Sequence, residues 1–545
     1  MTPSRFHVCV VGGGVAAVSA VRAITATWDG KSTASKTSIL VTIISTSPNL
    51  VEAVEEHHQR HDDDGDDDAS KHVSKASTGR TGMLAQLHVQ NVKDIASITA
   101  NHDVQVNVKC ASVHTCTLEG NEHVYRLTLD DASIIDAHAV IACSGARAVV
   151  PTKHDTAGVS VRDAADVQRL IGELHGARRV AVVGNGAIAL EMCHHVLEKT
   201  DAEVAWCCRD ATPGDAYFDV DASNFVLSRL LRDDNATKRP RTSRTSSART
   251  EVSSKTTGLS AGPNWLAQLD AAVAEREHTP TPANRRRERL KLYPNVLADE
   301  SLPAEMLPPM ARLATQPYRY GVHLSPPDEW IGADTVIVCC GVSPATGWVA
   351  SKAARAADGG LLVDAHMRCA NMPMLYAAGD TARMPYDEER PHFFQQRTWA
   401  QARLTGWTAG LTCVRDLARW MSNAPPPSPP AAVDEEVHVP VGLELFVHTT
   451  SFAGQPVVML GRHDGRHLDR CDTDSLQTLV SEQHDPPRFV RATLHDGKLI
   501  GACLIGMEAV SLAETFENLI LSELNVGHVG AALVDGSEDI EDYFD

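Results

Sequence analysis

The 545-residue chain has no apolar run of the roughly 18–20 residues that a membrane-spanning helix needs. It has no excess of basic residues either, since its formal net charge is −20, which argues against a surface that coats nucleic acid. Met1–Arg5 runs straight into an apolar stretch and lacks the pattern of a secretory signal peptide. We therefore expect a protein that is not secreted, contacts no membrane and binds no nucleic acid directly. The length favours two to four domains.

Paired cysteines at short spacing are also missing, although the chain has 13 cysteines. No CxxC or CxxxxC follows either of the two glycine-rich turns described below. Many of the cysteines stand in apolar runs such as VCVV and VIVCCG, which is typical of small buried side chains in a reducing compartment. Adjacent residues such as Cys339 and Cys340 point to opposite faces of a strand, so we expect no disulfide between them.

Two glycine-rich turns are the most informative features that are present. Residues 8–17 read VCVVGGGVAA and residues 180–189 read VAVVGNGAIA, each an apolar strand followed by G-x-G-x-x-A. In this motif the first glycine allows a tight turn, the second lets a pyrophosphate approach the backbone, and the small third residue lets helix and strand pack closely. The helix N-terminus presents free N–H groups to the phosphates. The repeated motif therefore predicts two dinucleotide sites.

The strand that follows each turn lacks the terminal acidic residue that usually binds a ribose hydroxyl. The first unit has Ser45 and Thr46 at this place, and the second has Cys208, Arg209 and Asp210. Arg209 either faces the 2′-phosphate of NADPH or lies in solvent beside Asp210. The choice between NADH and NADPH therefore stays open.

A third motif, AAGD at 377–380, is predicted to close the first nucleotide site. Asp380 stands at the end of a strand, where its carboxylate can accept hydrogen bonds from a sugar-alcohol chain such as the ribityl group of FAD. A helix predicted at 395–415 can aim its N-terminus at the flavin ring. Its dipole would then stabilise negative charge there by about 1–2 kcal/mol.

Composition marks several segments that cannot form a core. The acidic run at 55–72 and the basic run at 233–262 have few large apolar residues and are predicted to be solvated inserts. The histidines and aspartates of the acidic run lack the spacing of a metal site, so no metal is predicted there. The proline-rich stretch at 424–432 is predicted to be a stiff linker. Beyond it, alternating apolar residues favour antiparallel strands, followed by a helix predicted at 513–524.

These motifs resemble those of the two-dinucleotide-binding-domain flavoproteins, the pyridine nucleotide–disulfide oxidoreductase class. The resemblance covers about residues 5–420 and includes the strand-end motifs CSGA and CCGVSP. It implies an α/β fold with two Rossmann-like dinucleotide-binding domains, the second inserted in the first, plus an α+β C-terminal domain. The implied domains are 1–155 with 345–423 for FAD and 156–344 for NAD(P)H. Residues 433–545 take the place of an interface domain, for which we expect the role of a cap or docking surface.

The resemblance also implies which residues hold the two cofactors. The residues expected to bind FAD are Gly12, Gly14, Ala17, Ser45, Val113, Cys143, Gly145, Gly379 and Asp380. The residues expected to bind NAD(P)H are Gly184, Gly186, Ile188, Glu191, Arg209 and Gly341, with Glu191 near the nicotinamide. No catalytic side chain and no metal ligand is expected.

One departure from this class bears on how electrons leave the flavin. Disulfide reductases of the class carry a cysteine pair after the second strand or a CxxC in the NAD domain, whereas residues 46–60 here contain no cysteine and Cys193 stands alone on its helix. We therefore expect an FAD-dependent NAD(P)H oxidoreductase that passes electrons from flavin directly to oxygen or another acceptor. The alternative is a slow-turnover protein, loaded with flavin and NAD(P)H, that reports redox state to a partner.

A closer resemblance to one branch of the class rests on GNGAIALE, QQRTWAQARLTGW and the C-terminal ETFENLIL. It implies a flavoprotein of the cytoplasm and nucleus that protects a tRNA-splicing ligase from oxidation. No residue in the sequence marks a surface for such a ligase. The partner and the location are therefore expectations from the resemblance alone.

Overall fold

The computed structural model describes most of the chain. The described residues are 5–28, 38–55, 87–99, 103–119, 124–151, 158–161, 164–231, 283–384, 392–422, 444–465 and 475–536. The acidic run from residue 56 on, the basic run at 233–262 and the proline-rich stretch at 424–432 lie outside them. Among the described helices, none combines the length and the apolar character that crossing a bilayer requires.

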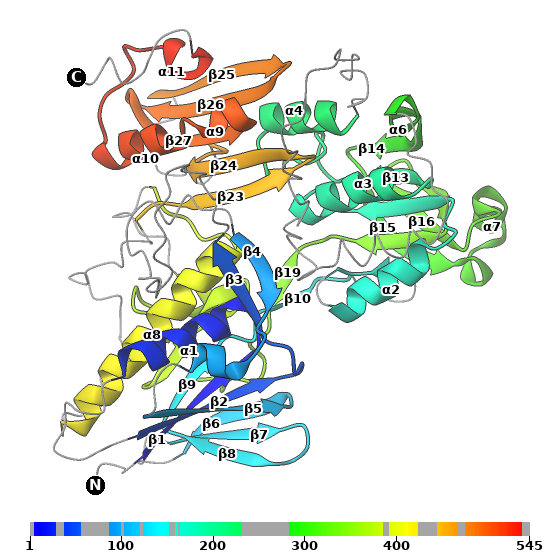
Figure 1. Ribbon diagram of the computed structural model, residues 1–545. Helices are drawn as coiled ribbons and strands as arrows, with labels where there is room; N and C mark the ends of the chain where they lie inside the picture. The colour runs from blue at the N-terminus through cyan, green and yellow to red at the C-terminus, as the bar shows by residue number, and fades with distance from the viewer. Residues whose placement is uncertain are drawn as a thin grey trace, which may run out of the picture.

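The first unit, built from the described residues of 5–151 and 345–422, is centred on a five-stranded parallel sheet (Figure 1). Its strand order is β21-β9-β1-β2-β5. The strands are β1 (Arg5–Val11), β2 (Ser38–Ser45), β5 (Val104–Cys110), β9 (Ala139–Ala142) and β21 (Leu375–Ala377). Nearly all apolar residues on β1 and β2 are buried, as expected for a parallel sheet that is covered on both faces.

Two long helices of the first unit pack closely against each other (Figure 1). They are α1 (Val15–Thr27), which follows the first glycine turn, and α8 (Trp399–Met421). Glycines on α8 permit the close approach, because a Cβ on Gly406 would lie 2.2 Å from the carbonyl oxygen of Ala16. A buried ion pair holds α8 to the sheet: Arg368 Nε lies 2.8 Å from Asp416 Oδ2, and Asp416 is fully buried.

Smaller strands surround this core. They are β3 (Val51–Glu55) paired with β4 (Leu87–Asn91), the antiparallel sheet of β6 (Val113–Glu119), β7 (Val124–Leu129) and β8 (Ile134–Ala137), and the pair β20 (Leu361–Leu362) and β22 (Ala382–Arg383). The pair β3–β4 was not predicted from the sequence.

The second unit, residues 158–344, repeats the strand–turn–helix plan around a second parallel sheet. Its strand order is β11-β18-β12-β13-β14. The strands are β11 (Gly158–Val159), β12 (Arg179–Val183), β13 (Glu203–Cys207), β14 (Leu290–Tyr293) and β18 (Thr335–Val338). The helices are α2 (Ala164–Leu174), α3 (Ala187–Lys199), α4 (Val220–Leu230), α6 (Ala283–Arg289) and α7 (Pro309–Thr315). An antiparallel sheet of β15 (Leu297–Pro303), β16 (Tyr320–Ser325) and β17 (Glu329–Ala333) completes the unit.

A two-stranded antiparallel ribbon joins the two units. The chain leaves the first unit through β10 (Ala146–Ala148) and returns through β19 (Val342–Pro344), which pairs with it. Because β21 and α8 of the first unit come later in the chain, the second unit is inserted in the first. This confirms the expected fold class.

The C-terminal region forms an antiparallel sheet with strand order β23-β24-β27-β26-β25. Its strands are β23 (Val447–Phe452), β24 (Gln455–Gly461), β25 (Leu476–His484), β26 (Pro487–His495) and β27 (Lys498–Ile505). They are followed by α9 (Met507–Val510), α10 (Ala513–Ser522) and α11 (Ala532–Asp535). The sequence pattern located this sheet but not β25.

The central strands of the C-terminal sheet are buried on both faces. Successive side chains of β24 show this, because they point into two different apolar cores. Val457 and Met459 belong to the apolar core of the second unit, whereas Val458 and Leu460 belong to the core beneath α10. A buried ion pair reinforces the first contact, with Arg491 Nε 3.3 Å from Asp219 Oδ2. The C-terminal sheet therefore packs onto the second unit of the same chain.

Candidate functional site

A cavity of about 1640 Å³ connects the two glycine turns. It exceeds the roughly 300–1,000 Å³ of a typical small-molecule pocket, so it has room for more than one ligand. Its wall includes residues of both parallel sheets, the start of α8 and the C-terminal strand β23. The two predicted nucleotide sites thus open into one space.

The first glycine turn has the geometry that its motif predicts. Gly12 has φ +128°, and a Cβ there would lie 2.0 Å from the carbonyl oxygen of Cys143, so only glycine fits. A Cβ on Gly14 would meet no described atom within 4 Å, and Gly14 lines the cavity. Gly14 is also the N-cap of α1 and supplies no side chain to cap its N–H groups, which leaves them for an anion.

The second turn repeats this geometry almost atom for atom. Gly184 has φ +132°, and a Cβ there would lie 2.2 Å from the carbonyl oxygen of Cys339. Gly186 is the N-cap of α3, lines the cavity and has open space where a Cβ would be. Both turns therefore form cradles that a side chain would fill.

The structure brings most of the predicted site residues together. Those that line the cavity are Gly14, Ser45, Cys143, Gly145, Gly184, Gly186, Ile188, Arg209, Gly341, Gly379 and Asp380. Gly12 makes the turn behind this wall, and Ala17 is fully buried where α1 meets the sheet.

Apart from Gly12 and Ala17, two predicted residues do not reach the cavity wall. Val113, the first residue of β6, packs in the core of the first unit. Glu191 is buried on α3, and its Oε1 lies 3.9 Å from His195 Nε2. Both residues therefore lie behind the cavity, and neither is part of its described wall.

The start of α8 forms one end of the cavity. The helix runs from Trp399 to Met421 instead of the predicted 395–415, because Thr398 is its N-cap and accepts a hydrogen bond from the Gln401 N–H. Arg397, just before it, donates to the backbone oxygen of Asp380 at 3.3 Å and to Asp358 at 2.7 Å. The helix N-terminus and a guanidinium therefore border the cavity beside Asp380.

Asn185, in the middle of the second turn, was not singled out from the sequence. Its amide nitrogen donates to Asp210 at 3.1 Å and to Asp215 at 2.6 Å, and its oxygen accepts from the Gly214 N–H at 2.6 Å. These bonds hold the loop after β13 against the turn. Asp210 is thereby held from within the protein, and its Oδ1 also lies 3.6 Å from Nε of Arg209, whose side chain is 81% exposed at the cavity rim.

The C-terminal sheet contributes a part of the wall that the sequence did not predict. His448, Thr449 and Thr450 of β23 line the cavity, and the His448 ring lies edge-on to Tyr217 at 6.3 Å. Burial, with the nearby His463, lowers the pKa of His448 to about 4, so its imidazole is neutral. The strand pattern of LELFVHTT marks these residues as a strand, but only tertiary packing brings them to this site.

Three buried polar atoms on the wall have no hydrogen-bond partner within the described part of the chain. They are Gln396 Oε1, His448 Nδ1 and Thr450 Oγ1. Buried polar groups are almost always hydrogen-bonded in folded proteins. Their position on the wall fits a cavity that a polar ligand completes.

The cysteines on the wall have no thiolate character. Burial raises the pKa of Cys207 to about 12 and also raises the pKa of Cys143, Cys339 and Cys340. The thiolate is the reactive form of cysteine, so these thiols are poor nucleophiles. The segment after β2, expected to lack a redox pair, forms β3 and gives the cavity the apolar side chain of Val51.

Comparison with known proteins identifies the family. The family model described as pyridine nucleotide-disulphide oxidoreductase matches residues 6–256 and 311–405. The chain belongs to this family. Members bind FAD and NAD(P)H, and the two cradles described above fit these cofactors. The family assignment supports a flavin-dependent NAD(P)H oxidoreductase.

Several relatives that carry one name align with this chain over most of their length. The Danio rerio protein called pyridine nucleotide-disulfide oxidoreductase domain-containing protein 1 is 30% identical over 446 residues, 81% of this chain and 84% of its own. The Homo sapiens protein of that name is 28% identical over 442 residues, 79% of this chain and 80% of its own.

Solved structures show the same fold at low sequence identity. A ferredoxin reductase for the CYP199A2 system from Rhodopseudomonas palustris has a TM-score of 0.60 and 13% identity, covering 98% of this chain and 99% of its own. The water-forming NADH oxidase from Lactobacillus brevis, bound to NADH, has a TM-score of 0.57 and 14% identity, covering 95% and 91%.

Proposed function

We propose that the protein transfers electrons from NAD(P)H through FAD to an acceptor without a dithiol relay. The observation that carries this proposal is the cavity that both glycine cradles share, whose described wall holds thiols with pKa values raised by burial and no two cysteines at CxxC or CxxxxC spacing. When bound, FAD supplies two-electron chemistry, accepting a hydride from NAD(P)H and passing the electrons on.

The first unit would hold FAD through the turn at Gly12 and Gly14 and through Asp380. The free N–H groups that begin α1 would bind the pyrophosphate of FAD, and the Asp380 carboxylate would accept hydrogen bonds from its hydroxyls. The N-terminus of α8 and the Arg397 guanidinium border the same end of the cavity. Their positive potential favours negative charge there, which assists hydride acceptance without a side-chain acid.

The second unit would hold NAD(P)H through Gly184 and Gly186, and the C-terminal sheet would complete that site. The buried Nδ1 of His448 and Oγ1 of Thr450 are hydrogen-bonding groups that a nucleotide can satisfy. We propose that these two residues position the nicotinamide end of the nucleotide. This gives the C-terminal region a role within its own chain.

We propose Arg209 as the residue that sets nucleotide preference. It lines the cavity beyond a strand end that carries no acid, while Asp210 is bonded to Asn185. An engineered NADPH oxidase with the same fold, TM-score 0.56 and 14% identity, carries substitutions that remove an aspartate and introduce arginines. By the same charge argument, we propose that Arg209 favours NADPH in this chain.

The experiment that tests the function is reduction of the FAD-loaded chain by NADH and NADPH without oxygen. We expect the absorbance of oxidised flavin to disappear, and steady-state turnover with oxygen or a quinone to follow. The matched control is Gly186→Ala, which should keep FAD and lose reduction by the nucleotide. Failure of both nucleotides to reduce the flavin would contradict the proposal. Rapid reduction with negligible turnover on every acceptor would favour the slow-turnover, redox-reporting alternative.

The expected partner and location also stand as proposals. We propose, from the resemblance described above, a role in protecting a tRNA-splicing ligase in cytoplasm and nucleus. Pull-down from cell extract in the presence and absence of NAD(P)H, together with imaging of the tagged chain, tests both. Absence of the ligase under both conditions would contradict the first, and exclusion from either compartment would contradict the second.

A further inference from the structure

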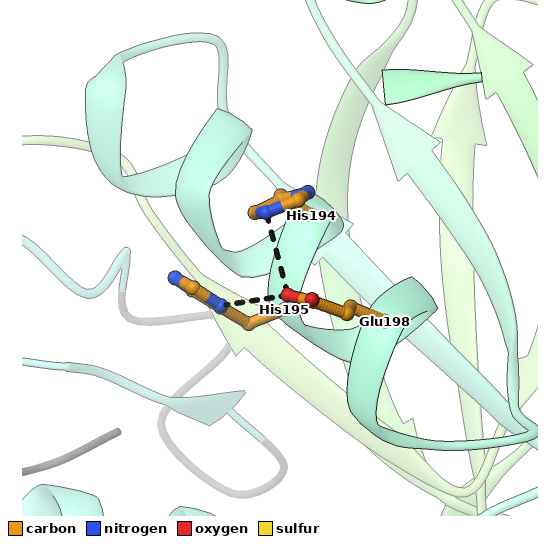
Figure 2. A group of neighbouring side chains, drawn as sticks. All are labelled: His194, His195 and Glu198. Carbon is orange, nitrogen blue, oxygen red and sulfur yellow. Dashed lines mark ion pairs between the residues drawn. The ribbon is translucent and has the colours of Figure 1, made fainter. Parts of the chain in front are cut away.

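The C-terminal half of α3 carries three potential metal ligands, His194, His195 and Glu198, whose ligand atoms lie within 4.8 Å of one another. Figure 2 shows a ring nitrogen of each histidine facing the Glu198 carboxylate, with His194 above it and His195 beside it. His194 Nε2 lies 3.5 Å from Glu198 Oε2, and His195 Nδ1 lies 4.0 Å from the same oxygen. The spacing i, i+3 and i, i+4 on one helix produces this convergence.

The separations are close to those of a tetrahedral site. Zinc bonds of about 2.0–2.2 Å to nitrogen and oxygen place neighbouring ligand atoms roughly 3.4 Å apart. The shorter N–O separation already matches, and the longer needs a small side-chain rotation. Glu198 and His194 are partly exposed, with side chains 37% and 18% accessible, so an ion has access. Three protein ligands leave one position for water.

A second carboxylate lies beside the buried histidine of this cluster. His195 Nε2 lies 3.9 Å from Oε1 of the buried Glu191, on the side opposite Glu198. Histidine ligands of metal ions commonly direct their other ring nitrogen to such a carboxylate, which fixes the ring.

We propose that His194, His195 and Glu198 bind a divalent transition-metal ion of the zinc type, with Glu191 as a positioning residue for His195. Two imidazoles and one carboxylate favour Zn²⁺, Ni²⁺ or Cu²⁺ over Ca²⁺ and Mg²⁺, which prefer oxygen ligands throughout. The helix α3 links this cluster to the cavity, because Gly186 and Ile188 at its start line the cavity and the cluster stands in its C-terminal half. The metal site therefore shares α3 with the second nucleotide site.

The test is Zn²⁺ titration of the FAD-loaded full chain in competition with a chromophoric chelator. The chain has 25 histidines, so the comparison between variants decides the result. We expect one tight equivalent in the wild type, lost in His194→Ala and Glu198→Gln, whose side chains are partly exposed and whose replacement leaves the core intact. His175→Ala, which removes an exposed imidazole of the same unit, should retain it.

Glu191→Gln tests the positioning role and should weaken Zn²⁺ binding by about 10–100-fold while retaining the stoichiometry. An anomalous-scattering map at the zinc edge should show one ion between His194 and His195. Equal titration of the wild type and His194→Ala, or an ion found elsewhere, would overturn the proposal. Unchanged affinity in Glu191→Gln would overturn the role of that carboxylate.

Discussion

The two glycine turns are nearly identical, but the elements that cover them differ. Gly12 and Gly184 have φ of +128° and +132°. At both, a Cβ would meet a backbone carbonyl at the end of the neighbouring strand in the sheet. The first turn is covered by α8, which Arg368 and Asp416 fix to the sheet. The second is covered by the C-terminal sheet. The motif thus specifies phosphate binding, and its surroundings specify which nucleotide binds and what happens to it.

The helices after the two turns show the same contrast. Both are 13 residues long, but α1 is buried along most of its length against α8, whereas α3 has a partly exposed side. Ala23 on α1 is fully buried near Gly410, and the matching position on α3 is His195. The absence of a glycine-bearing helix over this part of α3, within the described chain, leaves room for the histidine cluster.

The largest effect should come from placing a side chain in either glycine turn. Gly12→Ala and Gly184→Ala each place a Cβ about 2 Å from a carbonyl oxygen at positive φ, which the backbone cannot accommodate without shifting. We expect Gly12→Ala to abolish FAD retention and Gly184→Ala to keep FAD but abolish reduction by NAD(P)H. Flavin content after gel filtration and anaerobic reduction measure the two outcomes. Loss of FAD in Gly184→Ala alone would break the assignment of the turns.

The next largest effect should come from the buried ion pairs that anchor the covering elements. Arg491→Ala leaves Asp219 buried without its ion-pair partner at the contact with the second unit, and we expect destabilisation of about 3–5 kcal/mol. Arg126→Ala, which breaks an exposed pair with Asp136, is the control and should change stability far less, because exposed ion pairs contribute little. Denaturant unfolding measures both. Equal effects would show that the C-terminal sheet is not anchored through Arg491.

Arg209→Ala should lower the activity with NADPH more than the activity with NADH, and this effect should be smaller than the two above. A charged hydrogen bond to a phosphate contributes about 1.5–3 kcal/mol, so we expect kcat/KM for NADPH to fall about tenfold or more. The value for NADH should stay within about twofold, because NADH has no 2′-phosphate. A parallel loss for both nucleotides would assign Arg209 a general structural role instead.

The smallest effect should be on the pH dependence of stability, to which His323 of the second unit contributes. Burial lowers the pKa of His323, but hydrogen bonds to Asp299 and Asp328, each 2.7 Å long, outweigh it and raise the pKa above 6.5. The charged form is therefore favoured by folding, and its contribution is present below about pH 6.5 and fades as pH rises through the raised value. His323→Gln should flatten the change in melting temperature between acidic and neutral pH. An unchanged profile would exclude this group as its source.

The sequence predicted the turns well because their chemistry is local. Gly12, Gly14 and their counterparts each act through their own backbone, so a short motif is enough to locate them. The strands β3 and β4 were missed because they pair across a long intervening segment, and β25 was missed because its exposed side chains weaken the apolar alternation. His448 was missed for another reason. It reaches the cavity only through packing between units, which no local pattern encodes.

The central claim is that flavin is the only two-electron centre between NAD(P)H and the acceptor. Anaerobic titration of the FAD-loaded chain with NADPH tests it directly, with a parallel sample that is first reduced with dithiothreitol, alkylated under native conditions and then freed of both reagents. We predict complete loss of oxidised-flavin absorbance at one equivalent of NADPH per FAD, unaffected by alkylation. Consumption of two equivalents per FAD, with the second abolished by alkylation, would reveal a redox-active disulfide and contradict the account.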